Sequence, residues 1–261
     1  MSTLHDTMFD SVAMLQRNLV HAVRYPLIMY MIGVPVVVML LFVFAFGGTL
    51  GAGLPGGGDT DAYLEYIVPG IVFLAVGSAG QLAAISVAQD MTEGIIARFR
   101  SMDISRTAVM AGHVLGNTLQ QIIAVAVTMG VAVLIGFRAT ANLGGWLGAL
   151  GLVVMVTFAL TWLCVALGMK ARSVESASNL PMPLVLLPFL ASGFVPAESM
   201  STGLQWFAQY QPFTPFIETL RAFLLGTPMG INGWLSIAWC LVIGLGGWLW
   251  TRSLYDRRSL R

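Results

Sequence analysis

The densest group of ionisable residues in the sequence lies at residues 90–106, between two long apolar stretches. Its carboxylates and guanidinium groups are suited to ion pairs with another protein, and a glycine stands among them. These candidate docking residues are Asp90, Glu93, Gly94, Arg98, Arg100 and Arg106. Ile95, Phe99 and Met102 recur at helical spacing and give a short helix one apolar face. The pattern is typical of a docking helix, although a bland loop obeying the positive-inside rule would carry similar charge.

Groups for hydrolytic or covalent chemistry are missing. A P-loop needs Gly-Lys followed by Ser or Thr, but the single lysine, Lys170, stands between Met169 and Ala171. The three histidines are scattered, at His5, His21 and His113. They form neither a nucleophile–base pair nor a set of metal ligands. The sequence therefore predicts no catalytic residue, no metal and no cofactor in this chain, so that another subunit would supply any energy.

The composition indicates where these groups are positioned. Of the 261 residues, 57% are hydrophobic and 10% are charged, whereas a soluble domain carries about 25% charged residues. Six long uncharged stretches remain, and each can hold a membrane span of about 20 residues. The predicted spans are 27–47, 67–88, 110–135, 145–167, 179–195 and 231–250. Because irregular backbone cannot face lipid, we predict an all-α integral membrane protein with six transmembrane helices, forming a single domain over 1–261.

The positions of the basic residues predict the orientation. Eleven of the 13 fall in the two termini and the second and fourth loops, and only Arg138 and Arg221 fall on the other side. Basic residues favour the cytoplasmic side, so both termini are predicted to be cytoplasmic. Residues 6–24 place apolar side chains on one helical face and are expected to form an amphipathic helix in the interface. The net charge of +1 leaves no excess for binding nucleic acid.

The fifth loop, 196–229, is unusually aromatic and is interrupted by glutamines and prolines. Helices are expected at 200–210 and 215–225, with Pro212 between them and Pro215 opening the second. Glu218 and Arg221 are spaced to pair on one helical face. Two arrangements are equally compatible with this pattern: a re-entrant helical hairpin in the outer leaflet, and a surface loop resting on the bilayer. The glycine-rich stretch 47–58 is expected to be a flexible linker.

The predicted spans contain no Asp, Glu, Lys or Arg. Proton-coupled transporters commonly keep such a group within the membrane, so proton coupling is disfavoured, whereas sodium coupling through backbone carbonyls stays open. The second span offers the neutral polar residues Ser78 and Gln81. The fifth contains Pro181 and Pro188, which weaken a helix locally.

Two signatures in the sequence resemble those of the ABC type-2 permease family, and in particular its daunorubicin/doxorubicin-resistance-like exporters. The first is the acidic pair, glycine and arginines, with matches at Asp90, Glu93, Gly94, Arg98, Ser105 and Arg106. The second is the outer-loop pattern Phe194-Val195-Pro196, Leu204-Gln205-Trp206-Phe207 and Pro212-Phe213-Thr214-Pro215, with Arg221 and Gly226. Asp103 and Gln211 depart from the residues common in the family, which are Pro and Asn. The resemblance covers nearly the whole chain.

The resemblance implies a transmembrane permease subunit of an ABC exporter in the bacterial inner membrane. Residues 90–106 would be the coupling helix in a cleft of a separate ATP-binding subunit, present in two copies that carry the ATP and Mg. A second permease chain, identical or homologous, would complete the unit among the membrane lipids. A drug, lipid or glycolipid would pass between the second and fifth spans, near Ser78, Gln81, Pro181 and Pro188. Two alternatives stay open: a sodium-coupled transporter without an ATPase, and a non-transporting membrane anchor for a partner.

Overall fold

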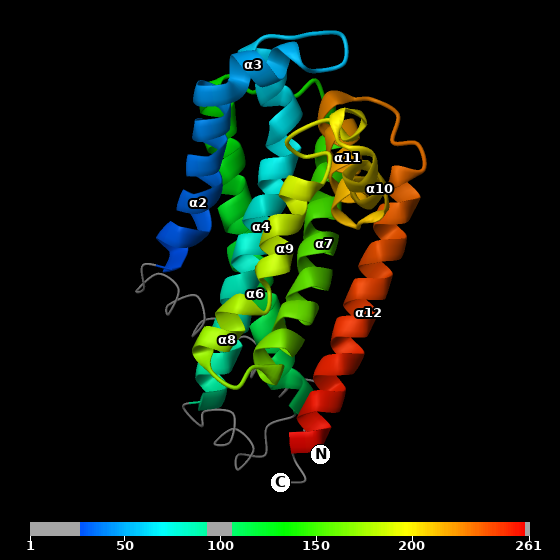
Figure 1. The fold of residues 1–261 in the computed structure, drawn as a ribbon. Coiled ribbons are helices and arrows are strands. Elements are labelled where there is room, and N and C mark those ends of the chain that lie inside the picture. The colour runs from blue at the N-terminus through cyan, green and yellow to red at the C-terminus, as the bar shows by residue number, and fades with distance from the viewer. Residues whose placement is uncertain (1–26, 93–105, 259–261) are drawn as a thin grey trace.

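The computed structural model describes residues 27–92 and 106–258, which fold as a helical bundle (Figure 1). Its long helices are α4 (Thr60–Thr92), α6 (Arg106–Ile135), α7 (Leu143–Lys170) and α12 (Asn232–Arg258). Before them come α2 (Leu27–Leu41), the π-helix η1 (Phe42–Phe46) and α3 (Gly47–Ala52). Between α7 and α12 lie short helices: α8 (Val174–Asn179), α9 (Met182–Leu186), the 3₁₀-helices η2 (Leu187–Leu190) and η3 (Ala197–Ser199), α10 (Thr202–Tyr210) and α11 (Phe213–Leu225).

Five helical stretches of the described residues are long and apolar enough to cross a membrane. They are Met29–Ala52, Thr60–Thr92, Val114–Ile135, Leu143–Lys170 and Asn232–Leu254. These five correspond to the predicted first, second, third, fourth and sixth spans, and the all-helical fold class is confirmed. The predicted interface helix, 6–24, lies outside the described residues.

The fifth predicted span was wrong as a single continuous helix over 179–195. The chain forms α8, α9 and η2 in succession, with breaks between α8 and α9 and after η2. Proline has no backbone N–H and its ring clashes with the preceding turn. Three prolines in eight residues, Pro181, Pro183 and Pro188, therefore prevent a regular helix. Residues 174–195 are called the broken segment below.

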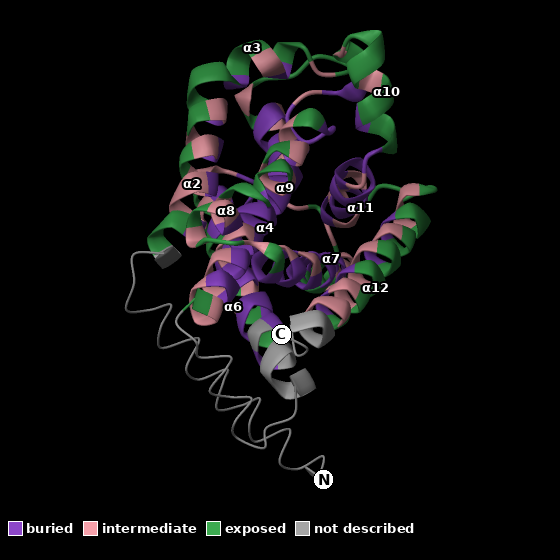
Figure 2. Cartoon of the chain, turned by 60° about the horizontal axis from the view of Figure 1, so that its bottom comes forward, coloured by how far each residue is buried: buried purple, intermediate pink, exposed green. Residues whose placement is uncertain are grey.

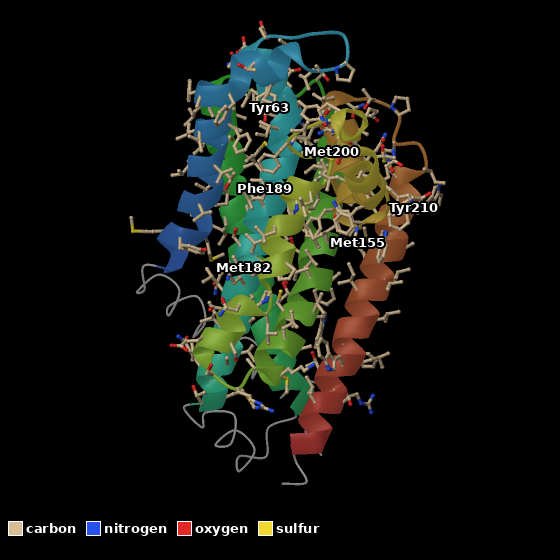
Figure 3. All side chains as sticks on the ribbon, in the orientation of Figure 1. Tyr63, Met155, Met182, Phe189, Met200 and Tyr210 are labelled. Atoms are coloured by element: carbon tan, nitrogen blue, oxygen red, sulfur yellow. The ribbon has the colours of Figure 1, made fainter. Side chains whose placement is uncertain are left out.

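The broken segment runs antiparallel to α4. Near one end Gln81 of α4 donates to the carbonyl oxygen of Ser178 at 2.5 Å, and near the other the Tyr63 hydroxyl donates to the carbonyl oxygen of Phe194 at 3.1 Å. Figure 3 shows the same course, with Met182 near the middle of the bundle, Phe189 above it and Tyr63 of α4 near the top. From residue 63 to 81 a helix rises about 27 Å, close to the roughly 30 Å hydrocarbon thickness of a bilayer.

The core of the bundle forms around α4, which is buried along most of its length, whereas α12 exposes much of its surface (Figure 2). Phe73 of α4 packs against Phe213 and Phe216 of α11, with ring centroids 6.5 and 5.8 Å apart. Large apolar side chains of α2, α6 and α12 point outward. Such an apolar surface is expected where lipid replaces water as the solvent.

The glycine-rich stretch 47–58 is only partly the linker that we predicted. Gly47–Ala52 is helical, as α3, and irregular backbone follows from Gly53. A side chain at Gly51 would collide with the carbonyl group of Asp59. Glycine is therefore needed at Gly51 because α3 folds tightly over the start of α4.

Candidate functional site: the contact of α4 with the broken segment and α11

The predicted docking residues lie at the junction of α4 and α6. Asp90 belongs to the last turn of α4, and Arg106 is the first residue of α6. Glu93, Gly94, Arg98 and Arg100 lie outside the described residues. The junction is at the end of the bundle opposite α3, α10 and α11 (Figure 1). The predicted coupling role of this set is not tested by the geometry and stays a prediction.

The predicted pathway residues of α4 lie in a packed interface. The Ser78 hydroxyl donates to the carbonyl oxygen of Leu74 at 2.9 Å and is 1% exposed, so it is satisfied within its own helix. Gln81 instead reaches across to the broken segment at Ser178. Both prolines are buried, Pro181 at the break before α9 and Pro188 in the first turn of η2. The structure therefore brings the predicted second and fifth spans together, in direct contact rather than around an open path.

Two glycines of α4 allow this contact. A Cβ atom at Gly77 would lie 2.7 Å from the carbonyl oxygen of Leu184, and one at Gly70 would lie 2.6 Å from the carbonyl oxygen of Gly193. Glycines at membrane-helix interfaces let backbones approach closely. Sequence reasoning did not single out these residues. Their spacing of seven, two turns of one helical face, was the available signal.

A polar cluster joins three segments at the end of the bundle near α3. Arg221 of α11 donates to a carboxylate oxygen of Glu218 at 2.6 Å, and to the carbonyl oxygens of Tyr66 and Ser192 at 3.0 Å each. Its guanidinium carbon lies 4.0 Å from the centre of the Tyr66 ring. The planar fork of arginine suits such multiple acceptors and aromatic stacking. Arg221 thereby connects α11 to α4 and to the broken segment.

The partners of Arg221 are themselves bonded to one another. The Ser192 hydroxyl donates to the carboxylate of Glu218, and the Tyr66 hydroxyl donates to the Ser192 carbonyl at 2.8 Å. The side chains of Arg221 and Glu218 are 12% and 30% exposed. The predicted Glu218–Arg221 pair is thus confirmed. Sequence reasoning missed Tyr66 and Ser192, which lie more than 25 residues away along the chain.

The turn between α10 and α11 carries the other predicted outer-loop residues. Pro212 precedes the first residue of α11, and Pro215 is buried in its first turn, where the missing N–H breaks no helical hydrogen bond. Gln211 is buried; its side-chain oxygen accepts from the Phe213 N–H at 3.2 Å, and its amide nitrogen donates to the Leu187 carbonyl at 3.4 Å. Gln211 therefore ties this turn to η2. The helices confirm the predicted break at Pro212.

The residues Tyr66, Ser192, Glu218 and Arg221 hold three segments together and are called the clamp below. Within the described residues, no three His, Cys, Asp or Glu side chains gather to hold a metal ion. The groups around Arg221 are a carboxylate, two carbonyl oxygens and two hydroxyls, which bond to its two terminal nitrogens and to one another, while the buried Nε of Arg221 has no hydrogen-bond partner. Such a network of hydrogen bonds stabilises an arrangement of helices.

Arg221→Gln is expected to lower the free energy of unfolding by about 2 kcal/mol, because breaking a buried charged network strands the other members. Arg221→Lys keeps the charge but not the forked geometry of arginine. Its free energy of unfolding should therefore lie between those of the unmodified chain and Arg221→Gln. Both cysteines, Cys164 and Cys240, are buried, so a thiol-reactive dye reports thermal unfolding of the purified chain. Arg172→Gln, at an exposed position, is the matched control. Equal midpoints for Arg221→Gln and Arg172→Gln would contradict the clamp.

Comparison with known proteins identifies related permeases. The sequence model of the ABC-2 type transporter family matches residues 11–225, which end with the last residue of α11. The daunorubicin resistance ABC transporter permease protein DrrB1 of Streptomyces coeruleorubidus is 30% identical over 195 residues, covering 74% of this chain and 66% of that protein. The probable doxorubicin resistance ABC transporter permease protein DrrC of Mycobacterium tuberculosis is 23% identical over 169 residues, covering 65% and 61%.

The matched region thus spans just under two thirds of the length of these curated relatives. The family match includes the junction of α4 and α6, the broken segment and the clamp on α11. The resemblance predicted from the two signatures is confirmed. The chain belongs to the ABC-2 type transporter family.

Proposed function

We propose that this chain is the membrane-spanning half of an ATP-driven exporter, energised by two separate ATP-binding subunits that carry ATP and Mg. Membership in the ABC-2 family makes it the permease component of an ABC transporter. Its apolar helices and bacterial relatives agree with a multi-pass protein of the bacterial cell membrane. The sequence has no P-loop, because Lys170 lacks the flanking residues. In this proposal the energy comes from a partner.

The course of α4 carries this proposal. At one end α4 leads directly into the predicted coupling segment, and at the other it meets the Arg221 clamp through Tyr66. Its 33 residues form one continuous helix about 50 Å long. A displacement of the coupling segment by an ATP-binding subunit would tilt α4 as a rigid body. That tilt would act along the whole contact with the broken segment.

The export pathway in this proposal opens between α4 and the broken segment. Their contact rests on small residues and few hydrogen bonds, so the two surfaces can part without breaking a helix. Pro181, at the break before α9, and Pro188, at the change from α9 to η2, would serve as hinges. Ser78 and Gln81 would then offer neutral polar groups to the substrate. The packed arrangement described above would be the closed state.

Six membrane crossings with both termini cytoplasmic form the proposed topology. The broken segment would be the fifth crossing, supported by its course along about 27 Å of α4. The helix directions place Arg106, Lys170 and Arg252 at one end of the bundle and Arg138 and Arg221 at the other (Figure 1). The first end would therefore face the cytoplasm. The helices α10 and α11 would form the outer hairpin, and a second permease chain, identical or homologous, would complete the unit.

The proposed substrate is lipophilic or amphipathic: a drug, lipid or glycolipid. The names of the relatives refer to daunorubicin and doxorubicin resistance. An apolar interface without charged residues at membrane depth suits cargo that partitions into the bilayer.

Affinity purification of the tagged chain from native membranes in mild detergent, followed by mass spectrometry, tests the proposal. A stoichiometric P-loop ATPase is expected to copurify. Export of an anthracycline into vesicles should then require both this ATPase and ATP. Reproducible recovery of the chain alone, with sodium-driven transport, would favour an autonomous carrier. An ATPase that binds without moving any cargo would favour a membrane anchor.

A further inference from the structure

A cavity of about 290 Å³ lies between α4, α6, α7 and α11, apart from the contact of α4 with the broken segment. Its walls include Val72 of α4, Val125 and Met129 of α6, Val153 of α7 and Leu220 of α11. No charged or hydroxyl-bearing side chain lines it. Three of its four walls belong to helices long and apolar enough to cross the membrane. In a membrane, the cavity would therefore open to the hydrocarbon of the bilayer.

The α11 wall of the cavity is held in place. Phe223 lies against α7 so closely that a side chain at Gly148 would collide with its ring. Leu224 lines the cavity together with Leu220. Its carbonyl oxygen accepts a hydrogen bond from the backbone N–H of Ala141 at 3.1 Å. The cavity is thus a defined feature between anchored helices, where filling it with hydrocarbon recovers lost contacts.

The rim of the cavity has the character of a lipid headgroup site. Trp146, in the first turn of α7, lines the cavity and is 40% exposed. Tryptophan favours the headgroup level of a membrane. Arg138 stands in the loop just before α7 and is exposed. One of its terminal nitrogens donates to the carbonyl oxygens of Val133 and Phe137, at 3.1 and 3.3 Å.

Arg138 keeps donors for an anion. Guanidinium has five N–H groups in a fork that matches phosphate geometry, and the hydrogen bonds recorded for Arg138 use one nitrogen. In the described part of the chain, no carboxylate pairs with it. Arg138 is thus a cation without a counter-ion in the loop that leads into α7, at the same end of that helix as Trp146, and such a group is complementary to an anionic amphiphile.

The size of the cavity is compatible with a flexible apolar occupant. An apolar protein cavity of about 150 Å³ accommodates benzene. The 290 Å³ found here suit part of one hydrocarbon chain. We propose that this cavity binds an acyl chain of an anionic phospholipid of the bilayer, whose phosphate group is held by Arg138 beside Trp146.

Photolabelling of the full chain tests this site. The purified chain would be placed in nanodiscs of phosphatidylcholine and phosphatidylglycerol, with a trace of phosphatidylglycerol carrying a diazirine in one acyl chain. Peptide mass spectrometry is expected to find the label concentrated on cavity-lining residues of α6 and α7. Labelling spread evenly over the lining residues and the exposed residues outside the cavity, Val127 included, would overturn the proposal.

Ala126→Phe and Val127→Phe form a matched pair on α6, because both positions are exposed and, of the two, Ala126 alone lines the cavity. The phenyl ring at 126 should lower cavity labelling about tenfold, since it removes the burial of roughly two methylene groups. The ring at 127 should leave it unchanged. Dye-monitored unfolding verifies that both variants are folded. Equal labelling in the two variants would exclude the cavity as the acyl-chain site.

Arg138→Gln tests the headgroup. Competition by unlabelled phosphatidylglycerol should exceed competition by phosphatidylcholine in the unmodified chain, and this preference should disappear in the variant because the phosphate loses its charged donor. Equal competition by the two lipids in the unmodified chain would refute the anionic headgroup. The measurement uses neither ATP nor a drug, so its result is independent of whether the proposed export function holds.

Discussion

Gly77→Leu is expected to force the broken segment away from α4 and to lower the free energy of unfolding by about 3 kcal/mol or more. The first side-chain atom would already lie 2.7 Å from the Leu184 carbonyl oxygen and 3.3 Å from the Val185 Cα atom. Both neighbours are backbone, so no rotamer change relieves the clash. The rest of the leucine side chain enlarges it.

Gly130→Leu is the matched control for Gly77→Leu. Gly130 lies in α6, another long apolar helix, and nothing comes within 4 Å of a Cβ atom built there. Leucine is a better helix former than glycine by up to about 1 kcal/mol, so this variant should be as stable as the unmodified chain or slightly more so. Reaction of the dye with Cys164 and Cys240 during heating compares the two. Similar midpoints for both variants would show that the glycine contact is dispensable.

Glu93→Ala and Arg98→Ala are each expected to abolish export while leaving membrane insertion intact. Both residues lie in the predicted coupling segment, outside the described residues, and belong to the docking signature. Removing one partner of an ion pair at a protein interface costs about 2–5 kcal/mol, which would uncouple ATP hydrolysis from α4. Transport into vesicles and copurification of the ATPase measure the two consequences separately.

Glu175→Ala and Arg172→Ala are the charge-matched controls for these variants. Both positions are exposed, near the start of α8, and neither belongs to the docking signature. They should retain export. Normal export by Glu93→Ala and by Arg98→Ala would refute the assignment of residues 90–106 as the coupling helix.

The residue sequence was sufficient for the features that depend on local pattern. Five of the predicted spans correspond to long apolar helices because the length of an uncharged stretch and the requirement for internal hydrogen bonds leave few other structures in lipid. The Glu218–Arg221 pair was predicted because residues three apart in a helix lie on the same face, about one turn apart. The family followed from two short signatures, in order along the chain.

The tertiary structure alone decided the contacts between distant segments. Pro181, Pro183 and Pro188 indicated a weak fifth helix, but only its packing on α4 shows where the backbone breaks and what replaces the lost helical bonds. The sequence did not predict that Tyr66 and Ser192 bond to Arg221. Arg221 donates to their backbone carbonyl oxygens, and every residue type has such an oxygen. The glycine contacts depend likewise on which helix faces are brought together. Non-local packing, unlike helical periodicity, is set by the whole chain at once.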